Sequence, residues 1–95
     1  MDIKYSINGE EMIVQLPKRV EKEECLRFEK ELYCIINSGT NYKTFFDAEN
    51  LDYISESALV VLKKLRLEFG DLKMINCKPD LLKFLKGNGY SELVK

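Results

Sequence analysis

The sequence predicts a single α/β domain with a mixed sheet, and three observations support that fold class. An Asn8-Gly9 turn signal lies between two segments in which apolar and polar residues alternate. The apolar spacing then changes twice from the period of a strand to that of a helix. Gly and Pro residues separate the segments, as they do between elements of secondary structure. We expect a four- to five-stranded sheet with helices packed against it.

The N-terminal residues 3–16 are predicted to form a β-hairpin. Apolar residues take every second position on each side of Asn8-Gly9, and this alternation predicts strands with one buried face. The alternating residues are Ile3, Tyr5, Ile7, Met12, Val14 and Leu16. Asn-Gly favours a two-residue type I′ turn because both positions tolerate positive φ. Pro17 ends the second strand.

Helical spacing begins near Val20 and continues to Asn37. Residues 37–39, Asn-Ser-Gly, supply the stop signal. Residues 42–47 then predict a short strand that is buried on both faces, because Phe45 and Phe46 are adjacent. The apolar stripe of the helix, which predicts one buried side, consists of Cys25, Phe28, Leu32, Ile35 and Ile36.

The second half of the chain repeats the alternation of helix and strand. A helix is expected over 57–69, ended by Gly70, and a strand over 72–77. Pro79 opens a shorter helix over 79–86, and the type of segment 90–94 stays open. The order ββαβαβα predicts that strands 42–47 and 72–77 are parallel. Residues 1–95 are expected to form one domain.

Composition and charge restrict the function classes. With 45% hydrophobic and 33% charged residues, the chain has the composition of an ordinary globular protein. Its net charge of −1 gives no reason to expect a nucleic acid or an anionic membrane as partner. No apolar run approaches the about 18 residues of a membrane span, and the N-terminus does not resemble a secretory signal. We therefore expect a cytoplasmic location without membrane insertion.

The chain contains three cysteines, Cys25, Cys34 and Cys77, and no histidine. Without histidine or a C-x-x-C pair, the usual zinc sites are excluded, and an odd number of cysteines argues against a disulfide framework. The helix and strand patterns place all three cysteines among small core residues. Histidine is the commonest general base, and because the chain contains none, we expect no enzymatic activity. We also expect no cofactor.

Residues 45–62 predict a buried strand, an acidic loop and a helix opened by hydroxyl and carboxylate side chains. Such a helix start suits anions because unpaired N–H groups gather there. However, the segment lacks the glycines and lysine of a phosphate loop and the Gly-x-Ser-x-Gly of a nucleophile elbow. One alternative is a hydrolase or nucleotide-binding protein that holds magnesium with Asp47, Asp52 and Glu56. Otherwise, this segment would present charge to another protein.

Several residues of this segment also have structural interpretations. Asp47 is expected to hold the loop through backbone N–H groups, as Asx side chains do. A hydroxyl at Ser55 or Ser57 would cap the helix, and Glu56 in the first turn would complement the helix dipole. The residues expected to anchor the loop on the core are Leu51, Tyr53 and Ile54.

Residues 47–62 read D-A-E-N-L-D-Y-I-S-E-S-A-L-V-V-L. This wording resembles, without a gap, the middle segment of the STAS domain family, approximately D-L-S-x-V-x-[YF]-[IM]-[DS]-S-[SA]-G-L-x-x-[LI]-L. Residues 70–79 resemble the glycine, strand and helix start that follow in the family, and residues 85–90 resemble its closing turn. The resemblance implies the fold of the bacterial anti-sigma factor antagonists.

The chain departs from the family pattern at the position that usually carries the regulatory switch. In family members that are switched by phosphorylation, the partner anti-sigma kinase modifies a serine at the start of this helix. The matching position is Glu56, which has no hydroxyl, while Ser55 replaces the usual Asp and Ala58 the usual Gly. The usual switch is therefore expected to be missing or altered, with Ser55 and Ser57 as candidate substitute acceptors. Glu56 carries less charge than phosphoserine and would mimic it only in part.

The resemblance implies a bacterial signalling protein that acts in transcription regulation by binding another protein. The expected partner is an anti-sigma factor of the serine-kinase type, whose capture releases a sigma factor. The alternative is a STAS subunit that regulates a transporter or a larger signalling assembly. No metal is expected. The expected contact surface is the 47–58 loop and the exposed side of the next helix, with Asp47, Asp52, Ser55, Glu56, Ser57 and Ala58 as its residues.

Overall fold

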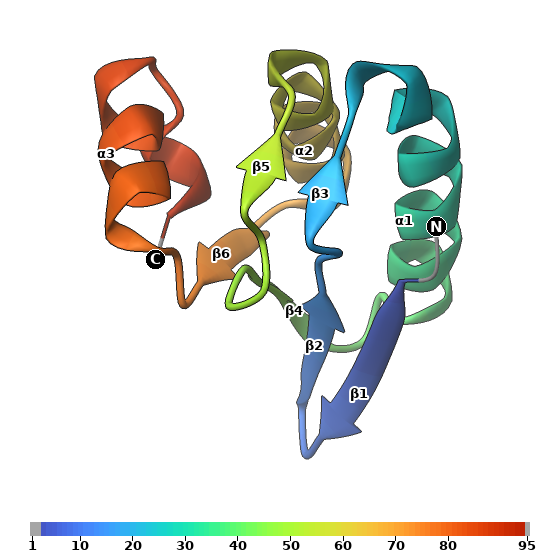
Figure 1. The fold of residues 1–95 in the computed structure, drawn as a ribbon. Coiled ribbons are helices and arrows are strands. Elements are labelled where there is room, and N and C mark those ends of the chain that lie inside the picture. The colour runs from blue at the N-terminus through green and yellow to red at the C-terminus, as the bar shows by residue number, and fades with distance from the viewer. Residues whose placement is uncertain (1–2, 95) are drawn as a thin grey trace.

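The observed elements alternate between strands and helices, as the α/β fold class requires (Figure 1). A computed structural model describes residues 3–94 of the chain. The elements are β1 (Lys4–Asn8), β2 (Glu11–Gln15), β3 (Arg19–Val20), the 3-10 helix η1 (Lys22–Glu24), α1 (Cys25–Ser38), β4 (Lys43–Asp47), β5 (Tyr53–Ile54), α2 (Glu56–Phe69), β6 (Lys73–Ile75), α3 (Pro79–Gly87) and the 3-10 helix η2 (Ser91–Leu93).

Four strands form the main sheet, in the order β1-β2-β4-β6. β1 and β2 are antiparallel, whereas β4 pairs in parallel with both β2 and β6. The predicted hairpin and the predicted parallel pairing of the strands near 42–47 and 72–77 are thus confirmed. The sheet is mixed, as expected. β3 and β5 form a separate two-stranded parallel pair.

The hairpin turn differs from the predicted type. Asn8 pairs with Glu11, so the two central residues of the turn are Gly9 and Glu10 rather than Asn8 and Gly9. Gly9 has a φ of 66°, and neither Asn8 nor Glu10 has a positive φ. Glycine with positive φ at the first central position alone is the preference of a type II′ turn. The glycine thus fixes the turn, while Asn8 belongs to the strand.

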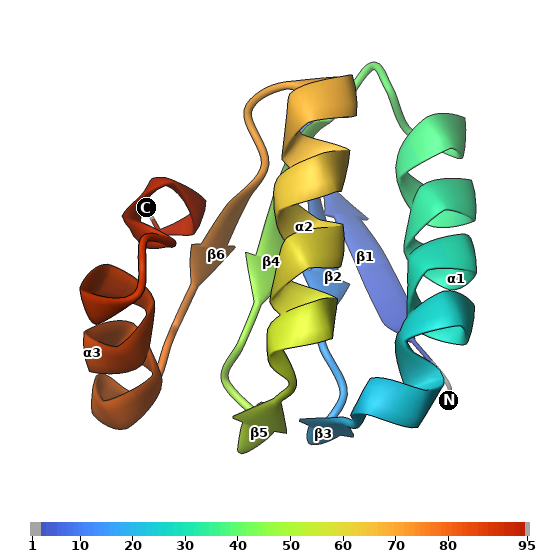
Figure 2. The same cartoon turned by 90° about the horizontal axis from the view of Figure 1, so that it is seen from above.

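Helices α1 and α2 lie side by side over one face of the main sheet, and α3 lies beyond β6 (Figure 2). The core lies between these two helices and the sheet, and Leu85 of α3, Tyr90 and Leu93 of η2 belong to the same cluster. η2 follows α3, and Val94 forms an isolated parallel bridge with Met74 of β6. The core residues with the largest fully buried side chains include Met12, Phe28, Leu32, Phe46, Leu59 and Leu62.

The helix predicted to begin near Val20 begins later, at Cys25. Val20 lies in β3, where it pairs with Ile54, and its carbonyl accepts a hydrogen bond from the Ser55 N–H at 2.9 Å. Its side chain is fully buried, which explains why it matched the apolar spacing of a helix. Backbone pairing with β5 therefore takes Val20 out of the predicted helix, and Lys22–Glu24 form the 3-10 helix η1 that precedes α1.

Strand β1 is the other clear departure from the predicted pattern. Tyr5 and Ile7 were expected to be buried, but they are 51% and 49% exposed. Their cross-strand partners, Val14 and Met12, are buried. β1 is the outermost strand of the main sheet, next to α1 (Figure 2), and at this edge its apolar side chains are only partly covered. Alternation identified the strand correctly but not its exposure.

Two further burial predictions were wrong. Cys34 is exposed on α1, whereas Cys25 and Cys77 are half-buried. Tyr53 is 42% exposed, although Leu51 and Ile54 are buried and do anchor the loop. Cys34 lines a groove with Ile3 and Tyr5 of the N-terminal strand region, which leaves it in contact with solvent.

Candidate functional site

The first turn of α2 is the centre of the candidate site, and Ser55 caps it. The Ser55 hydroxyl accepts a hydrogen bond from the Ala58 N–H at 3.3 Å. Ser55 is only 5% exposed, and its Oγ lies 3.5 Å from the Cys25 Sγ of α1. Of the two serines considered as caps, Ser55 therefore takes this role. Its hydroxyl faces the protein interior rather than solvent.

Glu56 and Ser57 occupy the first two helical positions, and both are exposed. Exposure of Glu56 in the first turn agrees with the sequence-based expectation. A carboxylate at this position interacts favourably with the partial positive charge of the helix start. Ala58, which follows, is fully buried beneath this turn. The site thus presents one carboxylate and one hydroxyl above a buried alanine.

Asp47 holds the loop that leads to this turn. Its Oδ1 accepts hydrogen bonds from the Glu49 N–H at 3.0 Å and from the Asn76 side-chain amide at 3.2 Å. The first of these bonds is the expected Asx interaction. The second joins the end of β4 to the end of β6. Asp47 therefore fixes the loop at the carboxyl ends of two neighbouring strands.

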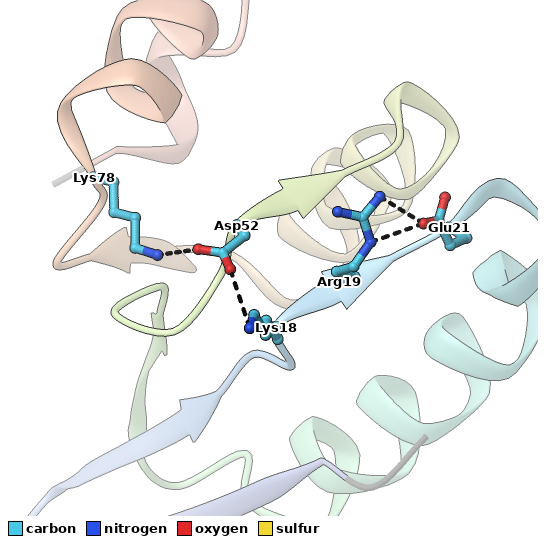
Figure 3. Close-up of polar contacts among 5 residues, drawn as sticks. All are labelled: Lys18, Arg19, Glu21, Asp52 and Lys78. Carbon is cyan, nitrogen blue, oxygen red and sulfur yellow. Dashed lines mark hydrogen bonds and ion pairs between the residues drawn. The ribbon is translucent and has the colours of Figure 1, made fainter.

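Asp52 lies between two lysines on the exposed side of the loop (Figure 3). Its carboxylate accepts a hydrogen bond from Lys78, and its Oδ2 lies 3.8 Å from the Lys18 Nζ. The hydrogen bond from Lys78, together with the charges of both lysines, lowers the pKa of Asp52 below its usual range. Because all three side chains are exposed, water and salt screen this interaction.

Residues 18–21 lie beside residues 52–54, the end of the loop that leads to α2. The sequence analysis did not predict this arrangement. The Lys18 carbonyl accepts a hydrogen bond from the Asp52 N–H at 2.7 Å. The Arg19 guanidinium lies 4.8 Å from the centre of the Tyr53 ring. It also lies 2.9 Å from a Glu21 carboxylate oxygen (Figure 3). Strands of two residues are too short to show alternation, so no pattern in the sequence could have identified this pairing.

A groove of about 320 Å³ separates the first turn of α2 from α3. Asp52, Tyr53 and Glu56 line one side, and Leu81 and Phe84 of α3 line the other. Phe84 is 43% exposed. The candidate surface therefore combines carboxylates with exposed aromatic side chains, and aromatic residues are enriched at protein-binding surfaces.

The structure does not support the alternative magnesium site. Asp47 bonds to Asn76 and Asp52 pairs with Lys18 and Lys78, so these two carboxylates are engaged apart from Glu56. Within residues 3–94, no group of three or more Cys, Asp and Glu side chains is placed to hold a metal ion.

In the same part of the chain, no helix is both long and apolar enough to cross a bilayer.

Comparison with known proteins gives matches in structure but not in sequence. No protein-family model matches the chain, and no curated protein matches it significantly. A provisionally assigned anti-sigma factor antagonist from Thermotoga maritima, TM1081, has a TM-score of 0.81 at 17% identity. That match covers 98% of this chain and 83% of TM1081.

Two other solved structures extend this similarity. The Bacillus cell fate determinant SpoIIAA, in its phosphorylated form, has a TM-score of 0.62 at 14% identity, covering 99% of this chain and 89% of SpoIIAA. The murine anion transporter Slc26a9 has a TM-score of 0.69 at 11% identity, covering 88% of this chain and 14% of the transporter. SpoIIAA is itself described as an anti-sigma factor antagonist. The chain therefore has the STAS-domain fold, which it shares with anti-sigma factor antagonists.

Proposed function

We propose that this chain is a protein-binding regulatory module that acts as an anti-sigma factor antagonist in the bacterial cytoplasm. It would bind an anti-sigma factor of the serine-kinase type and so release a sigma factor. The exposed first turn of α2, which carries Glu56 and Ser57 and is capped by the Ser55 hydroxyl, is the observation on which this proposal depends. The shared fold with SpoIIAA supports it.

The candidate residues divide into two roles in this proposal. Asp52, Glu56 and Ser57 are exposed and contact the partner. Asp47 and Ser55 are engaged in hydrogen bonds within the chain, so they position the loop and the helix. Ala58 is buried and supports the turn from below. The chain performs no catalysis in this scheme, because competition for the anti-sigma factor is sufficient.

Binding is constitutive in this proposal, since Glu56 has no hydroxyl at the family's phosphorylation position. Of the two substitute acceptors, Ser57 is exposed, whereas the Ser55 hydroxyl is buried against Ala58 and Cys25. A phosphate on Ser55 would require the cap to open. A phosphate on Ser57 would meet the like charge of Glu56 beside it. We therefore expect the amount of protein, rather than a kinase, to set the extent of binding.

A sigma-release assay tests this function. The purified complex of a serine-kinase anti-sigma factor and its sigma factor, both from the host of this chain, is mixed with increasing amounts of the chain. We expect free sigma factor to appear in proportion to the added chain, with and without ATP. No release at any ratio would contradict the function. Release that ATP abolishes, with phosphate on Ser57 or Ser55, would contradict the constitutive mode alone.

A second candidate function is regulation of a transporter, and the match to Slc26a9 favours it. In that case the chain would associate with a membrane transporter or a larger signalling assembly rather than with an anti-sigma factor. Affinity purification of the tagged chain from its host separates the two candidates. Recovery of an anti-sigma factor supports the first function, and recovery of an integral membrane transporter supports the second.

A further inference from the structure

The outer strand β1 carries apolar side chains that the fold of one chain does not bury. Tyr5 and Ile7 point to the side of the sheet that holds the core, because they pair with the buried residues Val14 and Met12. Nevertheless, both are about half exposed, at 51% and 49%. Figures 1 and 2 show β1 at the outer edge of the sheet, next to α1. A single copy of the chain therefore buries the apolar side chains of β1 only in part.

The backbone of β1 is also open on its outer side. Within residues 3–94, β2 is its one partner strand. In an antiparallel hairpin with a two-residue turn, the closing pair Asn8 and Glu11 exchanges hydrogen bonds, and so does every second pair after it. The N–H and C=O groups of Tyr5 and Ile7 then point away from β2. β1 contains no proline, which is a common means of blocking such an edge.

A groove of about 380 Å³ lies beside this strand, between β1 and α1. Ile3, Tyr5 and Ile35 give it an apolar surface, and Lys30 and Glu31 add one cation and one carboxylate. The Glu31 Oε2 atom is buried, and no hydrogen-bond partner for it is found in the part of the chain that the structure describes. Buried carboxylate oxygens ordinarily have donors, so this oxygen is an exception within the described residues, and the groove itself lacks an apolar cover.

We propose that β1 is an interface between two copies of this chain, which pair antiparallel around a two-fold axis at Ser6. In this register Tyr5 of each copy lies opposite Ile7 of the other. Both residues have backbone groups that point outward, so each Tyr5–Ile7 pair exchanges hydrogen bonds across the axis. Their side chains meet on the core side of the sheet, where aromatic and β-branched pairs are favourable. Two four-stranded sheets thus become one of eight strands.

A second copy fits this surface better than an unrelated strand because the surface is complementary to itself. A two-fold interface brings the same patch of both copies together, so the patch must match its own shape and charge. The β1 sequence gives one aromatic residue opposite one β-branched residue in both halves. Lys30 and Glu31 provide opposite charges in the same groove.

This interface goes beyond the proposed function and does not depend on it. The first turn of α2 follows the carboxyl end of β4, and none of its residues lines the groove beside β1. A dimer formed through β1 would present two copies of the α2 surface.

Sedimentation velocity of the full chain tests whether the dimer forms. From about 1 μM to about 1 mM protein, we expect the mass to rise from the 11.1 kDa of one chain toward that of two. Ile7→Lys should stay monomeric over this range, because two lysines would meet the tyrosines across the axis. Leu67→Lys replaces an apolar residue that is 88% exposed on α2 and should dimerise normally. A monomeric wild-type chain, or an Ile7→Lys variant that dimerises normally, would overturn the proposal.

Disulfide formation at the axis tests the register. Ser6 would lie opposite Ser6 of the second copy in a non-hydrogen-bonded pair, about 4.5 Å apart at Cα, which is within reach of a disulfide. In a Cys34→Ala background, Ser6→Cys should form a covalent dimer with oxidised glutathione as the oxidant. The matched control Asn8→Cys, on the same strand and face, should not, because it would lie opposite Lys4. No covalent dimer of Ser6→Cys, or equal amounts from both variants, would overturn the register and with it the proposed interface.

Discussion

The first turn of α2 and the strand β1 are both exposed, but they differ in what surrounds them. At α2 the exposed residues Glu56 and Ser57 are polar, and the buried Ser55 and Ala58 support them from below. At β1 the exposed side chains, Tyr5 and Ile7, are apolar and water covers half of each. The polar side chains of the first surface are well hydrated. Burial of the apolar side chains of the second surface against another surface would lower the free energy. Exposure alone therefore does not define a binding site, and its chemistry indicates what kind of partner it suits.

In this comparison the core supports the first turn of α2. The substitution with the largest expected effect on the free energy of unfolding tests that support. Leu59→Ala removes a fully buried side chain and should lower the free energy of unfolding by about 2–5 kcal/mol. Val60→Ala is the matched control, because Val60 is 52% exposed and should cost little. Urea unfolding monitored by circular dichroism measures both. Equal effects at the two positions would remove the distinction between support and exposed surface.

The cap gives a smaller effect of the same kind. Ser55→Ala removes the hydroxyl that accepts from the Ala58 N–H, and the loss should be about 1 kcal/mol of unfolding free energy. Ser57→Ala removes a hydroxyl of the same size from an exposed position and should change stability by less. The same urea titrations compare the variants. If Ser57→Ala costs more than Ser55→Ala, the capping role has been assigned to the wrong serine.

Glu56 belongs to the exposed side of the comparison, so its replacement should have a small effect on folding. Glu56→Ser restores a hydroxyl at the family's usual position and removes a carboxylate that complements the helix dipole. The expected loss is at most about 1 kcal/mol of unfolding free energy. Thermal and urea unfolding measure it. A loss several times larger would mean that the carboxylate has a structural role that its exposure does not indicate.

Asp52 should give the smallest effect, and this effect should depend on pH. Its pKa is lower in the folded chain than the usual value of 3.8, because Lys78 and Lys18 favour the charged form. A lowered pKa stabilises the folded state above about pH 4, and this contribution is lost as the pH falls below that value. The melting temperature of Asp52→Asn should therefore be slightly lower at pH 7 and equal near pH 2. A difference that grows toward acidic pH would contradict the ion pairing.

The sequence was sufficient to predict the elements that depend on local patterns. Phe45 and Phe46 marked a strand buried on both faces, and Pro79 and Gly70 marked a helix start and a helix end that the structure contains. The STAS resemblance located the turn at Glu56 correctly in the fold. Each of these signals consists of neighbouring residues whose conformational preferences do not depend on distant contacts.

The features that were missed depend on contacts between distant parts of the chain. Val20 pairs with Ile54 and accepts a hydrogen bond from the Ser55 N–H, and nothing near Val20 in the sequence indicates these distant partners. The exposure of Tyr5 follows from the position of β1 at the edge of the main sheet, which the sequence does not indicate. Lys18 and Lys78 meet Asp52 only after β3, β5 and α3 have been placed. At the candidate site, sequence therefore predicted the residues but not their partners.

The central claim is that the exposed first turn of α2 binds the partner. Titration calorimetry with a serine-kinase anti-sigma factor from the same host tests it most directly, using Ser57→Trp to place a bulky side chain on this turn. Asn41→Trp is the matched control, because Asn41 is also exposed. It precedes the amino end of β4, whereas the loop that leads to α2 follows the carboxyl end of that strand. We predict that Ser57→Trp weakens binding at least about tenfold, or about 1.4 kcal/mol, and that Asn41→Trp binds like the wild type. Unchanged binding of a folded Ser57→Trp variant would contradict the claim.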